Sequence, residues 1–301
     1  MKKLPINPNV TLLLNYKFPN CNSLLIKDER IALIDTGLGH DLLKEILNEV
    51  KIDLLINTHT HPDHVAGNKI VSEMTSAEIY VPVEEEGRSL SMDKMKKDLG
   101  VWGKFVEPAW EKIITENMGF QESSKEITYK NGHIFDLGRI QLKAIHTPGH
   151  SKGHYCFLSN DKELLFASDL GIDSFGPWYG YLDSNLNEFL KSIDMIRSLN
   201  IDKALSSHHD TLILNIDEWL NRCNQIVNNR EEKILGSLKE GRKDINDLSK
   251  YGIVYHNLTK ISGPMKKFLT FFEENMLKEH LRILQNAGKV EEKNGSYRIL
   301  S

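Results

Sequence analysis

Residues 58–64 gather three histidines and one aspartate in a run that reads Thr-His-Thr-His-Pro-Asp-His. Imidazole and carboxylate groups suit zinc, iron or manganese, and a cluster this dense after an apolar run indicates a metal or catalytic site rather than a polar loop. His59 and His61 are two positions apart, so on an extended segment both rings point to the same side and can share one ion. Asp63 and His64 are offset from them and can address a second ion nearby.

Three later residues can supply further ligands. His150 follows the tight turn that Pro148-Gly149 predicts, Asp169 follows the apolar run 164–167, and His208 follows the run 203–206. Each of these candidates therefore stands where a buried strand is expected to end. In layered α/β folds, functional residues collect at such strand ends, so one sheet system would bring these residues to a common site.

The elements that must position these residues follow from the hydrophobic pattern. Helical spacing predicts helices at 41–50, 92–99, 108–118 and 185–199. The stretch 77–130 carries mixed helical patterns with Trp102, Phe105 and Trp110, which we interpret as core packing or as a lid over the site. The expected strands are 10–14, 23–26, 31–35, 53–56, 78–82, 126–129, 133–137, 140–145, 155–158, 164–167 and 203–206.

The pattern changes after His209. Residues 217–239 form a long charged helical pattern, followed by helical patterns at 244–250, 266–275 and 276–286 and by a hairpin at 290–299 around Asn294-Gly295. This order suggests a winged-helix-like unit that serves for packing or dimerisation and reaches over the active site. We expect a catalytic domain at 1–215, with a helical insertion at 77–130, and a linker helix with a winged-helix-like domain at 216–301.

The ordered set of candidate ligands resembles that of the metallo-β-lactamase superfamily. The match runs from His59-x-His61-x-Asp63-His64 through Pro148-Gly149-His150 to Asp169 and His208, and the Asp35-Thr36-Gly37 turn also fits. The resemblance covers about residues 10–209 and implies an α/β (α+β) fold, the αββα four-layer sandwich. It implies two divalent ions, zinc in the first place, with iron or manganese as alternatives. One ion would be held by His59, His61 and His150 and the other by Asp63, His64 and His208, with Asp169 between them.

Other residues have two interpretations each. Asp35 either accepts a hydrogen bond from a ligand or loop group, or only stabilises its turn. His154, four residues after His150, can face the pocket. His209 stands where the family usually has glycine, so it contacts substrate or only alters the loop. Trp178 and Tyr179, in the aromatic segment 175–181, line a pocket or pack onto the sandwich.

Composition limits the class of partner. The 301 residues are 40% hydrophobic and 27% charged, and a net charge of −4 gives no global basic field for a nucleic acid. Three widely spaced cysteines suggest a reducing compartment. The start at 1–5 lacks a sustained apolar segment, and no apolar run is long enough for a membrane helix, so we expect a cytoplasmic protein without a membrane partner.

These features favour a dinuclear metal-dependent hydrolase that uses a metal-bridging hydroxide on an ester, thioester or lactone of a small metabolite. Asp63 is the candidate catalytic residue. Asp169 stands where true β-lactamases carry cysteine, and the C-terminal unit resembles the branch of lactamase-β-like protein 2 and the glyoxalase-II-like hydrolases. The alternatives are a metal-dependent phosphodiesterase or endoribonuclease, and a non-enzymatic metal- or DNA-binding regulator. A nucleic acid is thus not the favoured partner, and a homodimer is left open.

Overall fold

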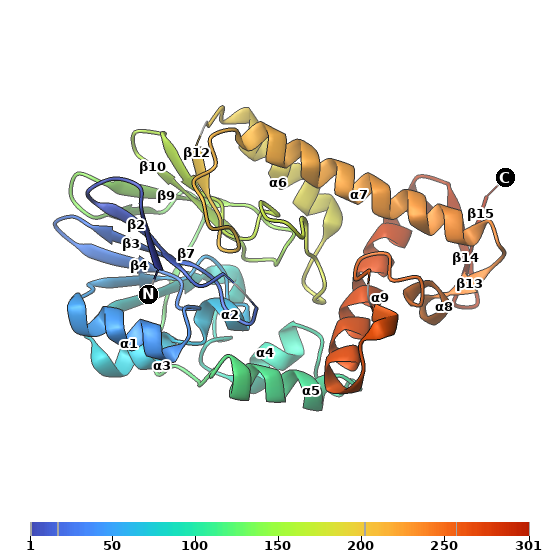
Figure 1. The fold of residues 1–301 in the computed structure, drawn as a ribbon, viewed down its shortest axis with the longest axis horizontal. Helices are drawn as coiled ribbons and strands as arrows, with labels where there is room; N and C mark the ends of the chain where they lie inside the picture. The colour runs from blue at the N-terminus through green and yellow to red at the C-terminus, as the bar shows by residue number, and fades with distance from the viewer. Residues whose placement is uncertain (1, 17, 202, 257, 301) are drawn as a thin grey trace.

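Two large sheets lie face to face in the computed structural model, which describes residues 2–16, 18–201, 203–256 and 258–300 (Figure 1). The first sheet is antiparallel from β1 to β4 and parallel from β4 to β7. Its strands, in spatial order, are β1 (Lys2–Pro5), β2 (Val10–Leu14), β3 (Ser23–Lys27), β4 (Ile31–Ile34), β5 (Leu54–Ile56), β6 (Glu78–Pro82) and β7 (Ile127–Tyr129).

The second sheet is antiparallel except for its β11–β12 pair. In spatial order it contains β12 (Lys203–Leu205), β11 (Leu164–Phe166), β10 (Tyr155–Ser159), β9 (Gln141–His146) and β8 (Ile134–Asp136). The strands expected between residues 10 and 206 are all present, with ends that differ by at most one residue. The strand β1 was not predicted.

Both faces of the first sheet are apolar because side chains alternate between its two sides. Leu12 and Ile34 point inward and join Phe157 of the second sheet in the core between the sheets. Leu13 and Leu33 point outward and pack on helices. This double burial explains why these strands have nearly continuous apolar runs.

Helices cover the two outer faces and complete the four-layer αββα sandwich that the sequence predicts (Figure 1). The helices α1 (His40–Glu49) and α3 (Asn68–Met74) cover the first sheet. The second is covered by α6 (Leu186–Ser198) and by the first half of α7 (Ile216–Leu238). The short helix α2 (Pro62–Val65) carries the second half of the histidine-rich run.

The helical insertion is narrower than the predicted range 77–130, because β6 and β7 at its ends are strands of the first sheet. Between them lie a 3-10 turn (Val83–Glu85), α4 (Met92–Asp98), α5 (Glu107–Lys112) and a π-helical turn (Ile113–Asn117). Trp110 of this segment packs in one cluster with Phe268 and Phe272 from the C-terminal region. The insertion and the C-terminal region therefore support each other.

We call residues 216–300 the C-terminal unit. It contains α7, β13 (Lys243–Asp244), α8 (Ile245–Ser249), a 3-10 turn (Leu258–Lys260), α9 (Gly263–Asn286), β14 (Val290–Lys293) and β15 (Ser296–Ile299), with its strands in the order β13-β15-β14. The two helices predicted at 266–275 and 276–286 are one helix, which corrects the prediction. No helix in the described part of the chain is long and apolar enough to cross a membrane.

The helix α7 belongs to both parts of the molecule. Leu220 and Val227 pack on the sandwich, whereas Ile234 and Leu238 pack on α9. A boundary at 215 therefore separates segments of sequence without separating two independent cores.

Candidate metal centre

The seven candidate ligands lie at one edge of the sandwich, each beyond the end of a strand. They form two groups, and within each group the potential ligand atoms lie within 4.8 Å of one another. The loop after β5 brings His59 and His61, and α2 brings Asp63 and His64. His150 follows β9, Asp169 follows β11 and His208 follows β12. The first group is His59, His61 and His150; the second is Asp63, His64, Asp169 and His208.

Three buried imidazoles make up the first group. The Nε2 atoms of His59 and His150 are 3.1 Å apart, and Nε2 of His61 makes no hydrogen bond within the described residues. Burial lowers the pKa of all three rings, and that of His59 and His61 well below the usual value. The rings are therefore neutral near pH 7, and their lone pairs can bind a cation.

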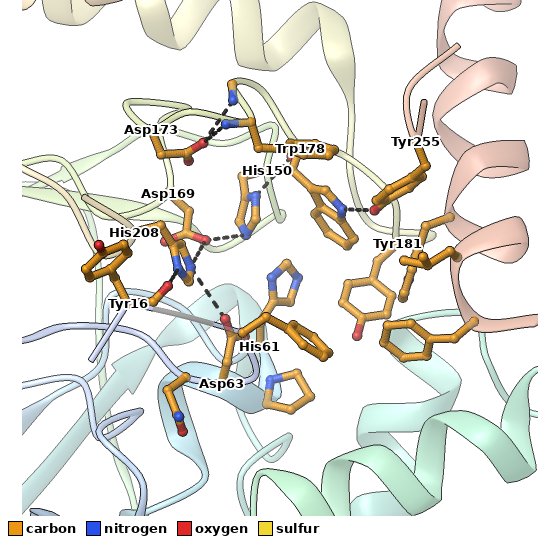
Figure 2. A pocket seen from close by; sticks show the side chains of 18 of the residues that line it. Tyr16, His61, Asp63, His150, Asp169, Asp173, Trp178, Tyr181, His208 and Tyr255 are labelled. Carbon is orange, nitrogen blue, oxygen red and sulfur yellow. Dashed lines mark hydrogen bonds and ion pairs between the residues drawn. The ribbon is translucent and has the colours of Figure 1, made fainter. Parts of the chain in front are cut away.

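The second group combines two carboxylates with two imidazoles. Figure 2 shows three of its members, Asp63, Asp169 and His208. Asp169 Oδ1 lies 3.3 Å from His64 Nε2, and its Oδ2 lies 3.2 Å from His208 Nε2 and 3.5 Å from His150 Nε2. Asp169 thus contacts both groups. Burial alone would lower the pKa of His208, but Asp169 and Asp63 raise it well above its usual value. These carboxylates therefore favour positive charge at this position, which a divalent cation would also provide.

The second ring nitrogen of the histidines is held by an outer partner. His59 Nδ1 lies 3.0 Å from Thr58 Oγ1, and His64 Nδ1 donates to Asp35 Oδ2 at 2.8 Å. His150 Nδ1 donates to the carbonyl of Trp178 at 3.0 Å. In these three rings the bonds place a proton on Nδ1 and leave Nε2 as the atom that can bind an ion, which is the usual arrangement around metal-binding histidines. The donor set therefore fits divalent ions.

Asp35 occupies the first of its two predicted roles. It is fully buried, its backbone has a φ of 61°, and its Oδ1 accepts the Thr58 backbone N–H at 2.8 Å. Thr58 Oγ1 donates to Asp35 Oδ2 at 2.8 Å, so the bond between Thr58 and His59 must use the proton of the imidazole. One carboxylate therefore orients a histidine in each group.

Gly37 allows the run 58–64 to approach the first sheet. A Cβ atom at Gly37 would overlap the Asp63 carbonyl oxygen and Cys21 Sγ. We expect Gly37→Ala to destabilise the protein by about 1–3 kcal/mol and to weaken metal binding, because the ligand loop must move. Thermal unfolding and bound-metal analysis measure both effects. Gly236→Ala on α7, where a Cβ meets nothing within 4 Å, is the control. Equal melting temperatures and metal contents in the two variants would contradict the prediction.

His154 acts on Asp169 and does not face the cavity. Its Nδ1 donates to the Thr147 carbonyl at 3.0 Å, and its Nε2 accepts the Asp169 backbone N–H at 3.0 Å. Burial lowers the pKa of His154 to about 3, so the ring remains a neutral acceptor. It therefore fixes the backbone of the residue that contacts both groups.

Two residues predicted near the pocket lie elsewhere. The buried hydroxyl of Tyr179 donates to His280 Nε2 at 2.7 Å, so its side chain faces the C-terminal unit and not the cavity. The His209 ring packs against Trp219 and its Nε2 lies 2.9 Å from Thr211 Oγ1. Trp178, in contrast, does line the cavity. Trp178 and Tyr179 therefore face opposite sides of the segment 175–181.

A cavity of about 630 Å³ opens beside both groups (Figure 2). Its walls come from Tyr16, Phe18 and Asn20, from the segment 173–181 and from α9, and among the described residues that line it there is no lysine or arginine. Sequence patterns did not identify the contribution of α9, because an amphipathic helix reveals an apolar stripe but not its partner. The apolar and aromatic lining residues are Phe18, Met118, Phe175, Trp178, Tyr181, Tyr255, Met265, Phe268, Leu269 and Phe272.

A buried ionic network behind the ligand loops was also missed. Glu85 Oε2 accepts the backbone N–H of Thr60 at 2.6 Å, and its Oε1 accepts that of Gly153 at 2.9 Å. Arg88 lies 3.4 Å from Glu85 and 2.8 Å from Asp183, and Glu85 and Arg88 are both fully buried. The network joins the His59–His64 loop to the His150–His154 loop. The Glu-x-x-Arg spacing is the only trace of it in the sequence, and it is equally common on exposed helices.

Comparison with known proteins finds relatives in sequence and in fold. Residues 16–208 match the family model described as the metallo-beta-lactamase superfamily. Hydroxyacylglutathione hydrolase of Francisella tularensis subsp. novicida (strain U112) is 24% identical over 196 residues, which are 64% of this chain and 64% of that protein. The chain thus matches slightly less than two thirds of that relative's length. Acyl-coenzyme A thioesterase MBLAC2 of Homo sapiens is 26% identical over 202 residues, 61% of this chain and 70% of the relative.

A solved structure extends the likeness to the whole fold. The crystal structure of a metallo-beta-lactamase family protein from Thermus thermophilus has a TM-score of 0.73 at 20% identity. It covers 98% of this chain and is itself covered completely. The C-terminal unit is therefore included in the shared architecture.

Proposed function

The chain belongs to the metallo-beta-lactamase superfamily, and from this membership we propose that it is a metal-dependent hydrolase that cleaves an ester, thioester or lactone with an apolar acyl group. The main support for this proposal is that the two ligand groups share Asp169 and lie at the wall of an apolar cavity. The names of the two relatives, a hydrolase of acylglutathione and an acyl-coenzyme A thioesterase, support an acyl substrate.

We assign one ion to His59, His61 and His150, and a second to Asp63, His64 and His208, with Asp169 shared; zinc is the proposed metal because neutral imidazoles predominate. Such a pair of divalent ions, when bound, acidifies a shared water and polarises the acyl carbonyl. The chain's own contribution is to hold the ligand rings in one tautomer through Thr58, Asp35 and Trp178. Asp63 borders the cavity, so its carboxylate orients the attacking water.

The volume and the lining of the cavity favour an apolar acyl group in the substrate. Its volume of about 630 Å³ lies within the usual range for small-molecule sites, and aromatic side chains form most of the wall opposite the ligands (Figure 2). Phe272 packs on Trp178 and Tyr181 at ring-centroid distances of 5.1 and 5.0 Å. A phosphodiester would place its anionic oxygens among these rings and Asp173, with no lysine or arginine among the described lining residues. An apolar acyl group is therefore the better fit.

We also propose roles for the surrounding segments. The insertion between β6 and β7 supports α9 through Trp110, and α9 covers the cavity with Phe268 and Phe272. Residues 1–215 supply the metal ligands, and residues 216–300 supply the cover. The C-terminal unit thus acts on a small substrate at this site and is not primarily a nucleic-acid reader.

A substrate panel tests the function. The zinc-loaded protein is assayed with p-nitrophenyl acetate, butyrate and octanoate, with the matching thioesters, and with bis-p-nitrophenyl phosphate. We expect ester and thioester cleavage, with kcat/KM rising by up to about fourfold for each methylene group that enters the cavity. Chelation should abolish the activity and zinc should restore it.

Each outcome of the panel decides between the candidate functions. Cleavage of the phosphodiester with intact esters and thioesters would establish the phosphodiesterase alternative. A protein that binds metal but hydrolyses none of these compounds would contradict the hydrolase proposal. Equal rates for the acetate and octanoate esters would refute the proposed apolar acyl group but not the hydrolase function.

A further inference from the structure

The loop 177–180 connects the metal centre to the C-terminal unit through its backbone carbonyls. The Trp178 carbonyl accepts the Nδ1 proton of His150 at 3.0 Å (Figure 2). Two other carbonyls of this loop bond to the C-terminal unit: that of Pro177 accepts from Arg230 Nη1 at 2.7 Å, and that of Gly180, two residues after Trp178, accepts from Asn275 Nδ2 at 2.8 Å. The C-terminal unit thus holds both flanks of the carbonyl that orients a candidate ligand.

Arg230 makes the strongest of these attachments. The residue is only 5% exposed, and its Nη1 donates to both the Pro177 carbonyl and the Tyr179 hydroxyl, the latter at 2.9 Å. The Tyr179 hydroxyl donates in turn to His280 Nε2 at 2.7 Å. Arg230 therefore bonds to the residue before Trp178 and to the residue after it. The second of these contacts is supported by α9, which carries His280.

The Trp178 side chain does not replace this attachment. Its Nε1 donates to the Tyr255 hydroxyl at 2.8 Å, which restrains the indole ring where it lines the cavity. The direction of the Trp178 carbonyl depends instead on the two neighbouring peptide groups. Arg230 holds the carbonyl of the peptide group that precedes Trp178 and the side-chain hydroxyl of the residue that follows it, whereas the indole bond restrains only the Trp178 ring.

We propose that Arg230 is a positioning residue for the metal centre: it fixes the Trp178 carbonyl, which holds His150 with Nε2 directed at His59 and His61. The inference rests on the proposed metal-binding function. Through α7, the C-terminal unit then helps to build the first ion site, in addition to covering the cavity. Loss of the outer hydrogen-bond partner of a ligating histidine typically lowers metal affinity by about 10–100-fold.

The test compares Arg230→Met with Lys233→Met, which removes an exposed positive charge from the same helix. Both variants and the parent protein are loaded with cobalt(II), and the affinity of each ion is measured by competition with a chelator. The visible spectrum reports on ligand geometry. We expect Arg230→Met to weaken one of the two ions by about 10–100-fold and to change the spectrum, while the other ion remains within about threefold of the parent. Lys233→Met should behave as the parent.

Tyr179→Phe provides a second test if Arg230→Met folds poorly. It preserves the ring but removes one of the two groups that Arg230 holds, so it should weaken the same ion by a smaller factor. Arg230→Lys, which can still donate to the Pro177 carbonyl, should recover part of the affinity. His150→Ala identifies which ion is affected, because it removes the ligand itself.

The outcomes separate this inference from the proposed function. A parent protein that binds no divalent ion would refute the metal-binding function itself. A parent that binds two ions, with Arg230→Met and Tyr179→Phe unchanged in affinity and spectrum, would overturn only the role of Arg230. Equal weakening of both ions would also overturn it, because a general loss of stability does not select the His150 site.

Discussion

Asp169→Asn is expected to lower kcat by on the order of 10³-fold, because the catalytic contribution of correctly placed metal ions amounts to several kcal/mol. Asp169 places its carboxylate within 3.2–3.5 Å of Nε2 atoms of His64, His150 and His208. The substitution removes one negative charge and one acceptor oxygen from a carboxylate that contacts both ligand groups. We therefore expect fewer than two bound ions per chain.

The matched control is Asp173→Asn. Asp173 also lines the cavity, but its Oδ1 accepts the backbone N–H groups of Phe175 and Gly176 and it belongs to neither ligand group. Metal analysis and steady-state kinetics on the same preparations distinguish the two variants. If Asp169→Asn retains two ions and a kcat within about tenfold of the control, the shared role of Asp169 is wrong.

The candidate metal ligands could be picked out of the sequence because their signal is local. Histidines and aspartates are packed densely in residues 58–64, and His150, Asp169 and His208 each follow an apolar strand pattern. The αββα sandwich that the resemblance implies is confirmed by the structure. The individual strands and helices could be predicted because period-two and period-3.6 patterns report on the faces that strands and helices bury. Such patterns do not depend on knowing which segments meet.

The main feature of the site that the sequence did not reveal depends on a contact between distant segments. Arg230 stands in a charged helical pattern, and only its burial against the Pro177 carbonyl distinguishes it from the exposed Lys233. The strand β1 was missed because its Lys2-Lys3-Leu4-Pro5 sequence is polar, as suits an exposed edge strand. The helix α9 was divided at 275–276, although no glycine or proline interrupts residues 265–287.

Arg88→Met is expected to lower the free energy of unfolding by about 3–5 kcal/mol and the melting temperature by on the order of 10 °C. Arg88 is fully buried among the carboxylates of Glu85, Asp98 and Asp183, at 3.4, 3.1 and 2.8 Å. Its removal leaves the buried Glu85 charge without compensation. Arg30→Met is the control, because the exposed pair of Arg30 with Glu78 should contribute no more than about 1 kcal/mol.

The loss of unfolding free energy in Arg88→Met should also depend on pH, and the ionisation of the Glu85 carboxyl sets its direction. Burial alone would raise the pKa of Glu85, but Arg88 and the hydrogen bonds from Thr60 hold it below its usual value. In the parent, the ionised carboxylate therefore stabilises the fold above the unfolded pKa of about 4.3, and this contribution disappears as the pH falls through the folded pKa.

In Arg88→Met, burial without the arginine raises the folded pKa, so ionisation at higher pH opposes folding. The difference in unfolding free energy, measured by urea denaturation, should therefore be larger at about pH 8 than at about pH 5. A difference that is constant over this range, or that grows toward acid, would show that Glu85 is not the group that Arg88 keeps charged behind the ligand loops.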